Sequence, residues 1–201
     1  MTATLQRRLQ PSGSDRSFGA LVAQTGAQVR ALVDRLAAGD LHTFAWQEAM
    51  LETLAAAHAQ AGYRGRVRAG DTAPFDRDDE RFGYLAAQEE SAYLWSFRQD
   101  IENGRYGVEE PNTDAIHRRA ALYVARIAGT ANEALVLTAG DEEVWTWRTD
   151  PGENCPDCLR LEAHSPYRGT PPTTPRRGDT ACLGHCHCRL QSSRGVETFA
   201  P

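Results

Sequence analysis

The residues best suited to chemistry in this 201-residue chain are its five cysteines, all of which lie between positions 155 and 188. Cys155 and Cys158 form a CxxC pair, and Cys182, Cys186 and Cys188 follow after residues 159–181. A CxxC turn directs two sulfurs toward one ion, at the Zn–S distance of about 2.3 Å. Tetrahedral zinc needs four ligands, which the three later thiols and the neighbouring imidazoles can complete. The spacing therefore predicts a zinc site.

The expected ligands are thiols alone: Cys155, Cys158, Cys182 and Cys186, with Cys188 as an alternative ligand. Side chains alternate between the two sides of an extended segment, so Cys186 and Cys188 can share one side while His187 faces away. We interpret His185 and His187 as surface residues beside the site, although an imidazole could replace one thiol.

Two other uses of the cysteines are less consistent with the pattern. Disulfides would suit a secreted protein, but the odd count and the absence of an apolar signal core in the first residues favour a metal site in a reducing compartment. A redox CxxC would sit at a helix N-terminus in a βαβ unit, without three further thiols nearby. Four protein ligands leave no position for a substrate water, so we expect the zinc to be structural and the chain not to be an enzyme.

Composition and charge exclude several functions. The chain is 41% hydrophobic and 24% charged, which is ordinary for a folded protein. The formal net charge of -5 disfavours broad binding to a phosphate backbone. Every basic residue is arginine, which removes lysine nucleophiles. No stretch approaches the ~18 apolar residues of a membrane span, so no membrane role is expected.

Four helices are expected ahead of the cysteines, from apolar residues that recur every three or four positions. The first begins near Ser14 or Ser17 and ends at Gly39. The second occupies about 41–61 behind an Asp40 cap, and residues 62–74 are predicted to be a loop. The third begins at the acidic turn 76–80 and ends at Asn103 and Gly104, and the fourth runs from about 111–114 to 137. The inward stripe predicted for the third helix is Phe82, Leu85, Ala86, Tyr93, Phe97 and Ile101.

A short strand is predicted at 142–148, where residues alternate with a period of two and Trp145 and Trp147 share a face. The four tryptophans are interpreted as core or interface anchors, and His42, His58 and His117 as partly exposed helix residues. The predicted fold class is mainly α: a helical body of about four helices followed by a small C-terminal β/zinc-knuckle module. The predicted ranges are a flexible N-terminal arm at 1–14, a helical domain at 15–140, the zinc-knuckle module at 141–192 and a flexible tail at 193–201.

The segment 144–190 is specific enough to compare with a known family. The aromatic strand VWTWR leads into CPDC, and CHC closes the segment. This arrangement resembles the C-terminal motif of the phage Mu F-like minor head protein (head morphogenesis) family, and the helical part is similar in layout. Members often end in HPNCRC. Here Leu183 stands at the His position, Cys182 lies one residue earlier, and His187 replaces the Arg.

The resemblance implies a minor head (capsid) protein of a tailed bacteriophage, a structural protein of virion assembly that acts near the portal. Its partners would be portal or capsid proteins, with weak contact to phage DNA as a further option. No membrane and no small-molecule substrate is implied. The expected location is the virion, or the host cytoplasm during assembly.

Two alternatives stay open. In a ββα-metal nuclease, which also contains a Cys/His knuckle, His164, His185 or His187 would activate water. No Asp/Glu–His or His–His–Asn pattern follows Cys158, so the catalytic roles are unfilled. A zinc-stabilised nucleic-acid-binding module would stack Tyr167 on bases and contact phosphates through the arginines of the tail. These are Arg160, Arg168, Arg176, Arg177, Arg189 and Arg194.

Overall fold

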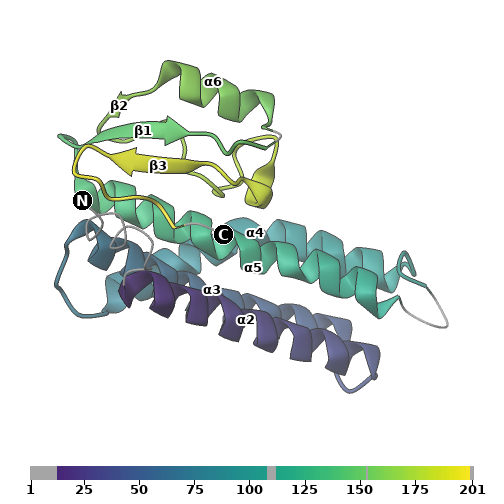
Figure 1. Cartoon of the computed structure of the whole chain (residues 1–201). Helices are drawn as coiled ribbons and strands as arrows, with labels where there is room; N and C mark the ends of the chain where they lie inside the picture. The colour runs from purple at the N-terminus through teal and green to yellow at the C-terminus, as the bar shows by residue number, and fades with distance from the viewer. Residues whose placement is uncertain (1–12, 108–111, 153, 200–201) are drawn as a thin grey trace, which may run out of the picture.

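A computed structural model describes residues 13–107, 112–152 and 154–199. Four long helices come first: α2 (Gly13–Ala37), α3 (Thr43–Ala69), α4 (Arg77–Glu102) and α5 (Thr113–Ala139). A small module follows, with β1 (Val144–Arg148), α6 (Pro156–His164), β2 (Tyr167–Arg168), the 3-10 helix η2 (Leu183–His185) and β3 (Arg189–Ser192). Figure 1 shows the module lying against α5, on the side of the bundle away from α2. The predicted fold class is confirmed.

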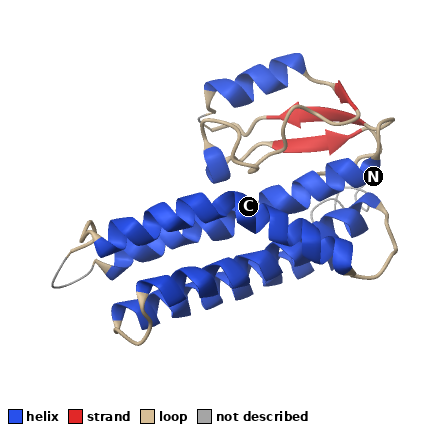
Figure 2. Cartoon of the chain, turned by 180° about the vertical axis from the view of Figure 1, so that it is seen from behind, coloured by secondary structure: helices blue, strands red, loops and turns tan. Residues whose placement is uncertain are grey.

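The first part of the predicted N-terminal arm, residues 1–12, lies outside the described residues. Positions 13 and 14 already belong to α2. None of the helices in the described ranges combines the length and apolar character needed to cross a bilayer. Viewed from behind, the bundle of long helices again lies on one side and the strands with α6 on the other (Figure 2).

Local capping chemistry explains where the helices begin. Asp76 accepts hydrogen bonds from the backbone N–H groups of Asp78 and Asp79, and Asp79 completes a capping box at the start of α4. Asn112 caps α5 through Ala115 N–H at 3.0 Å. Both starts agree with the sequence prediction.

The predicted caps of the first two helices are wrong. Helix α2 begins at Gly13, so Ser14 and Ser17 lie inside it. Helix α3 has His42 at its N-cap, with no side-chain cap. Asp40 instead helps to end α2: its N–H bonds to Arg35 O and that of Gly39 to Leu36 O. Gly39 has φ 76°, and this paired geometry is the Schellman motif.

The segment 62–69, predicted to be a loop, is the last part of α3. Gly62 and Gly65 are buried there because the neighbouring helices leave no room for a side chain. A Cβ at Gly65 would lie 2.2 Å from Ala131 O of α5, and one at Gly62 would lie 2.7 Å from Phe82 of α4. The glycines that suggested a loop are contact points between helices.

The inward stripe of α4 also differs from the prediction. The buried positions are Asp79, Gly83, Ala87, Glu90, Leu94 and Phe97. Leu85 and Tyr93 are exposed instead, with 62% of Tyr93 accessible. Two small residues and two acids occupy four of these six positions, so a search for large apolar residues did not find this face.

The module is an antiparallel sheet of order β2-β1-β3. Trp145 pairs with Tyr167 on one side and with Ser192 on the other, and Trp147 pairs with Leu190. Both tryptophans are fully buried in a cluster with Leu135 and Val136 of α5 and with the cysteines. As predicted, the two indoles share a face, and α5 is one of the elements that cover it.

Residues 193–199, predicted to be a flexible tail, fold back onto the molecule. Gln191 forms a β-bridge with Glu197, and Thr198 N–H bonds to Leu190 O. Phe199 is buried, with its ring 4.4 Å from that of Phe18 in α2. The apolar ring at position 199 finds its place only in the folded bundle, so local composition did not indicate it.

Candidate metal centre

The CxxC pair lies at the start of α6, directly after the chain leaves β1. Cys155 is the N-cap of α6, and its sulfur accepts the Cys158 N–H at 3.5 Å. Pro156 occupies the first helical turn, where its missing N–H costs nothing. Cys158 points inward and is 1% exposed. The turn therefore places both sulfurs on the side that faces η2.

The later cysteines approach this pair closely. Cys182 Sγ lies 3.5 Å from Cys155 Sγ and 3.6 Å from Cys158 Sγ, and Cys186 Sγ lies 3.6 Å from Cys158 Sγ. Four sulfurs around a zinc ion at 2.3 Å would be separated by about 3.8 Å, the edge of the tetrahedron. These three separations are close to that edge length, but Cys186 does not lie within 4.8 Å of both Cys155 and Cys182, so the sulfurs would have to draw together around one ion.

The five thiols form two overlapping groups. Cys155, Cys158 and Cys182 make one, and Cys158, Cys186 and Cys188 the other, with all sulfurs of a group within 4.8 Å of one another. Cys158 belongs to both, so it is the centre of the cluster. The clustered and mostly buried cysteines can bind a metal ion such as zinc. The set of four expected from the sequence, and the choice between its members and Cys188, stays a prediction.

The histidines near the cluster turn outward. His185 and His187 are exposed, whereas Cys186 and Cys188 are buried, which is the alternation predicted for this segment. His164, at the end of α6, is exposed and bonds through Nδ1 to Arg160 O at 2.7 Å. Among the described residues, both candidate metal-binding groups consist of cysteines alone.

Neighbouring polar groups hold the loops that carry the thiols. Asp157 accepts the Ala181 N–H at 2.9 Å, which ties the CxxC turn to the later cysteines. Buried Arg176 donates from Nε to Cys186 O at 3.0 Å. Thr180 Oγ1 lies 3.2 Å from Cys182 Sγ. These bonds stabilise ligand orientation, as outer groups do at metal sites.

The electrostatics of the cluster favour a cation. Burial raises the pKa of Cys158 and of Cys182, and a hydrogen bond with Cys188 together with burial raises the pKa of Cys186. Burial also acts to raise the pKa of Cys155, but hydrogen bonds from Cys158 and Cys182 lower it to about 7. Several thiolates cannot share this space without a positive charge, which a bound metal would supply. All five thiols are free.

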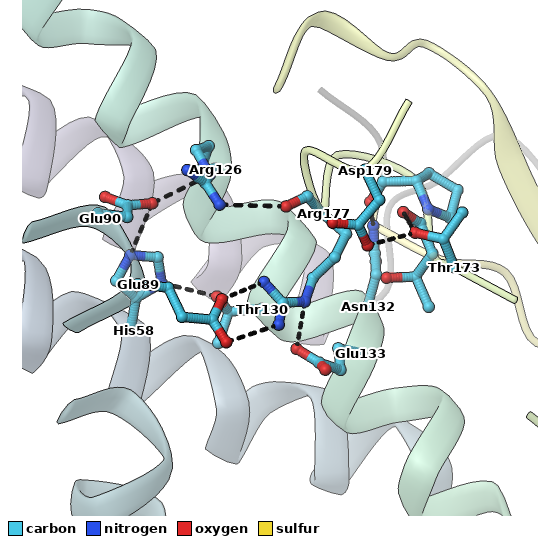
Figure 3. Close-up of polar contacts among 12 residues, drawn as sticks. His58, Glu89, Glu90, Arg126, Thr130, Asn132, Glu133, Thr173, Arg177 and Asp179 are labelled. Atoms are coloured by element: carbon cyan, nitrogen blue, oxygen red, sulfur yellow. Dashed lines mark hydrogen bonds and ion pairs between the residues drawn. The ribbon is translucent and has the colours of Figure 1, made fainter. Parts of the chain in front are cut away.

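A separate group of polar side chains joins the module to the bundle (Figure 3). Arg177, in the loop before the later cysteines, forms a two-bond ion pair with Glu89 of α4 at 2.6 and 3.1 Å and contacts Glu133 of α5 at 2.9 Å. Arg126 of α5 donates to Arg177 O at 3.2 Å. A Cβ at Gly129 would lie 2.3 Å from Arg176 O, so the loop rests directly on α5.

Behind this joint lies a buried pair that the sequence analysis missed. His58 and Glu90 are each 1% exposed, with Nε2 and Oε1 3.6 Å apart. His58 Nδ1 lies 2.7 Å from Thr130 Oγ1, and Arg126 Nε lies 3.1 Å from Glu90 Oε1. The prediction that His58 is partly exposed is wrong. Glu90 lies on the same helix face as Gly83, Ala87 and Leu94, at intervals of three and four residues, and this spacing could have revealed that Glu90 is buried.

A hollow of about 540 Å³ opens between the bundle and η2. Its wall includes Tyr93, Tyr123, Arg119, Arg126, Arg177 and His185. The three arginines already contact acids: Arg119 with Asp100, Arg126 with Glu90 and Arg177 with Glu89. Burial raises the pKa of Tyr123 to about 12, so its hydroxyl stays protonated.

Fold and site together define a helical bundle carrying a cysteine-rich C-terminal module able to bind metal. Comparison with protein-family models, with curated proteins and with solved structures finds no match for this chain.

Proposed function

We propose that the chain is a minor head protein of a tailed bacteriophage that acts in head morphogenesis near the portal, and that its cysteine cluster holds one structural zinc ion. The observation that carries this proposal is the folding of segment 144–190. The residues that resemble the Mu F-like motif form one compact unit, in which β1, α6 and β3 surround the five thiols. The residues that carry the resemblance therefore pack together in one folded module.

Zinc is the ion that best fits a site built from thiols. Zinc prefers sulfur ligands, and three of the sulfur separations, at 3.5–3.6 Å, are close to the edge of a zinc tetrahedron. Binding of zinc to small Cys-rich segments contributes about 10–16 kcal/mol in apparent terms. The module has strands of two to five residues and a small core, so such a contribution is large compared with its own packing. A zinc ion held by four protein side chains has no coordination position left for a substrate, so its role is structural.

The surface of the bundle supports a role in protein contacts. Tyr84, Leu85, Tyr93 and Trp95 are large apolar side chains exposed along α4. Aromatic residues are enriched in protein interfaces, where they contribute much of the binding energy. These residues are candidates for contact with portal or capsid proteins.

Binding of nucleic acid is less well supported. All six tail arginines are engaged within the chain: Arg160 with Asp157, Arg168 with Glu142, Arg176 with Cys186 O, Arg177 with Glu89, Arg189 with Glu197 and Arg194 with Glu143. Phosphate contacts would have to replace these pairs.

Incubation of the chain with plasmid DNA and Mg²⁺ or Mn²⁺ tests the nuclease alternative, and cleavage would refute the assembly role.

Metal analysis tests the zinc site. Native mass spectrometry of the full chain is expected to show about one zinc ion, since one tetrahedral site accounts for four thiols. Cys155→Ser or Cys158→Ser should lose it, and the change should be tolerated at one of Cys182, Cys186 and Cys188. A chain without bound transition metal, or with bridged sulfurs, would remove the basis for the proposal.

The assembly role has its own test. In the phage that encodes the chain, a nonsense change in its gene should leave aberrant heads while tails form normally, and the protein should be found in purified proheads by mass spectrometry. Normal heads in the mutant, together with absence of the chain from proheads, would contradict it.

A further inference from the structure

A groove runs along the outer face between α3 and α4. It contains two adjoining hollows of about 330 and 430 Å³. Ala55 and Tyr84 line both hollows, so the two adjoin and together form the groove. The floor is made of small side chains, because Gly83 brings the backbone of α4 so close to Ala59 that a Cβ would lie 2.2 Å from its nitrogen.

The rim of the groove is acidic. Glu48 and Glu52 of α3 line one hollow, and Glu80 of α4 lines the other. All three are exposed, and none forms an ion pair with another described residue. No arginine lines either hollow. An apolar floor with an unbalanced negative rim suits a segment with apolar side chains and positive charge.

The chain itself contains such a segment. Met1, Leu5 and Leu9 recur every four residues, and Arg7 and Arg8 lie among them, while residues 1–12 contain no acid. In a helix, the three apolar residues would share a face. We propose that the α3–α4 groove binds residues 1–12 of this chain, with the apolar face on the alanine floor and the arginines at the acidic rim.

Length and position agree with this occupant. The α3 wall from Glu48 to Gln60 spans about 18 Å at 1.5 Å per residue, which equals the length of a twelve-residue helix. The start of α2 lies at the Arg68 end of α3, because Phe199 contacts both Phe18 and Arg68. Gln60 is the groove residue of α3 nearest Arg68, so the segment would enter the groove from the end that lies nearer the start of α2.

Photo-crosslinking of the full-length chain tests the proposal. A benzoylphenylalanine at position 5 or 9 should form adducts with peptides from 44–60 or 75–88, identified by mass spectrometry. The same probe at Leu159, exposed on α6, should not label these segments. Adducts within one chain and adducts between two chains both support the groove as the binding site, and the mass of the product tells them apart.

Charge reversal makes the test specific. Glu48→Arg with Glu52→Arg, or Arg7→Glu with Arg8→Glu, should lower the adduct yield about fivefold, since two exposed ion pairs together contribute roughly 1 kcal/mol. Combining the two double changes should restore the yield, and reversal of Asp141 and Glu142 should not alter it. Adducts that map to other segments, or adduct yields that the charge reversals leave unchanged, would overturn the proposal. Circular dichroism confirms that each variant is folded, and the result does not depend on the role in phage assembly.

Discussion

Glycine decides how closely several segments of this protein approach each other. A Cβ at Gly65 of α3 would lie 2.2 Å from Ala131 O and 2.9 Å from Leu135 N, both backbone atoms of α5. Backbone atoms cannot turn away as a flexible side chain can. Helix α3 and helix α5 would therefore have to separate to accept a methyl group there.

We expect Gly65→Ala to destabilise the protein by about 1–3 kcal/mol, the usual cost of overpacking a core. Gly19→Ala is the matched control, because Gly19 lies in α2 with nothing within 4 Å of the added carbon. Alanine should stabilise that helix by roughly 0.5–1 kcal/mol. Urea unfolding measures both. Equal effects of the two changes would show that the close contact at Gly65 is not real.

At the level of helices, the start of α4 depends on its cap. Asp76 accepts hydrogen bonds from two backbone N–H groups that would otherwise lack partners, whereas Asp40, the acidic residue before α3, donates its backbone N–H to Arg35 O at the end of α2. The two aspartates look alike in the sequence but differ in function.

Asp76→Ala is expected to cost about 1 kcal/mol, the typical loss when a helix N-cap is removed. Asp40→Ala should change the free energy of unfolding by less than about 0.5 kcal/mol, as for exposed surface positions. Thermal or urea unfolding of the two variants provides the comparison. A larger loss at Asp40 than at Asp76 would contradict the caps described here.

In the whole molecule, α5 connects the bundle to the module, and Arg177 of the module forms ion pairs with Glu89 and Glu133 of the bundle. The two glutamates that contact Arg177 are expected to make the free energy of unfolding depend on pH in opposite directions. The hydrogen bond from Arg177 holds the pKa of Glu89 below its usual value of 4.5, whereas burial raises the pKa of Glu133 in spite of the same arginine. A lowered pKa contributes stability above about pH 4.5 that is lost as the pH falls, and a raised pKa does the reverse.

We therefore expect Glu89→Gln to be less stable than the parent chain near neutral pH, by about 0.2–1 kcal/mol because the pair is half exposed. The difference should shrink as the pH falls below about 4.5. For Glu133→Gln the stability of the parent relative to the variant should instead decrease as the pH rises. Urea unfolding between pH 3 and pH 7 gives both trends. A destabilisation by Glu89→Gln that does not shrink below about pH 4.5 would mean that Arg177 does not pair with Glu89 in solution.

Loss of metal should affect the module and spare the bundle. Trp145 and Trp147 pack against the cysteine cluster, while Trp46 lies in the bundle core against Phe97, at 5.2 Å between ring centroids. On treatment with a chelator, fluorine NMR of fluorotryptophan-labelled protein should show shifted or broadened signals for Trp145 and Trp147. The Trp46 signal serves as the internal control and should stay in place. Unchanged signals from all four tryptophans would argue against a metal that stabilises the module.

Local patterns in the sequence were enough to predict the cysteine cluster, four helices and a tryptophan strand. Each of these depends on neighbouring residues: the CxxC spacing, the acidic first turn of α4, or the alternation around Trp145. An acidic first turn or a period of two is encoded within a few positions, so it can be recognised without knowing the rest of the fold, whereas the caps of α2 and α3 were predicted wrongly.

Other features exist only because distant segments meet. The last turns of α3 are helical because α5 and α4 fill the space beside Gly62 and Gly65, and Glu90 is buried because Arg126 and His58 come to it from other helices. Phe199 is anchored by Phe18, almost the whole chain away. These contacts depend on packing between elements, and the tertiary structure alone decides which polar group or ring is enclosed.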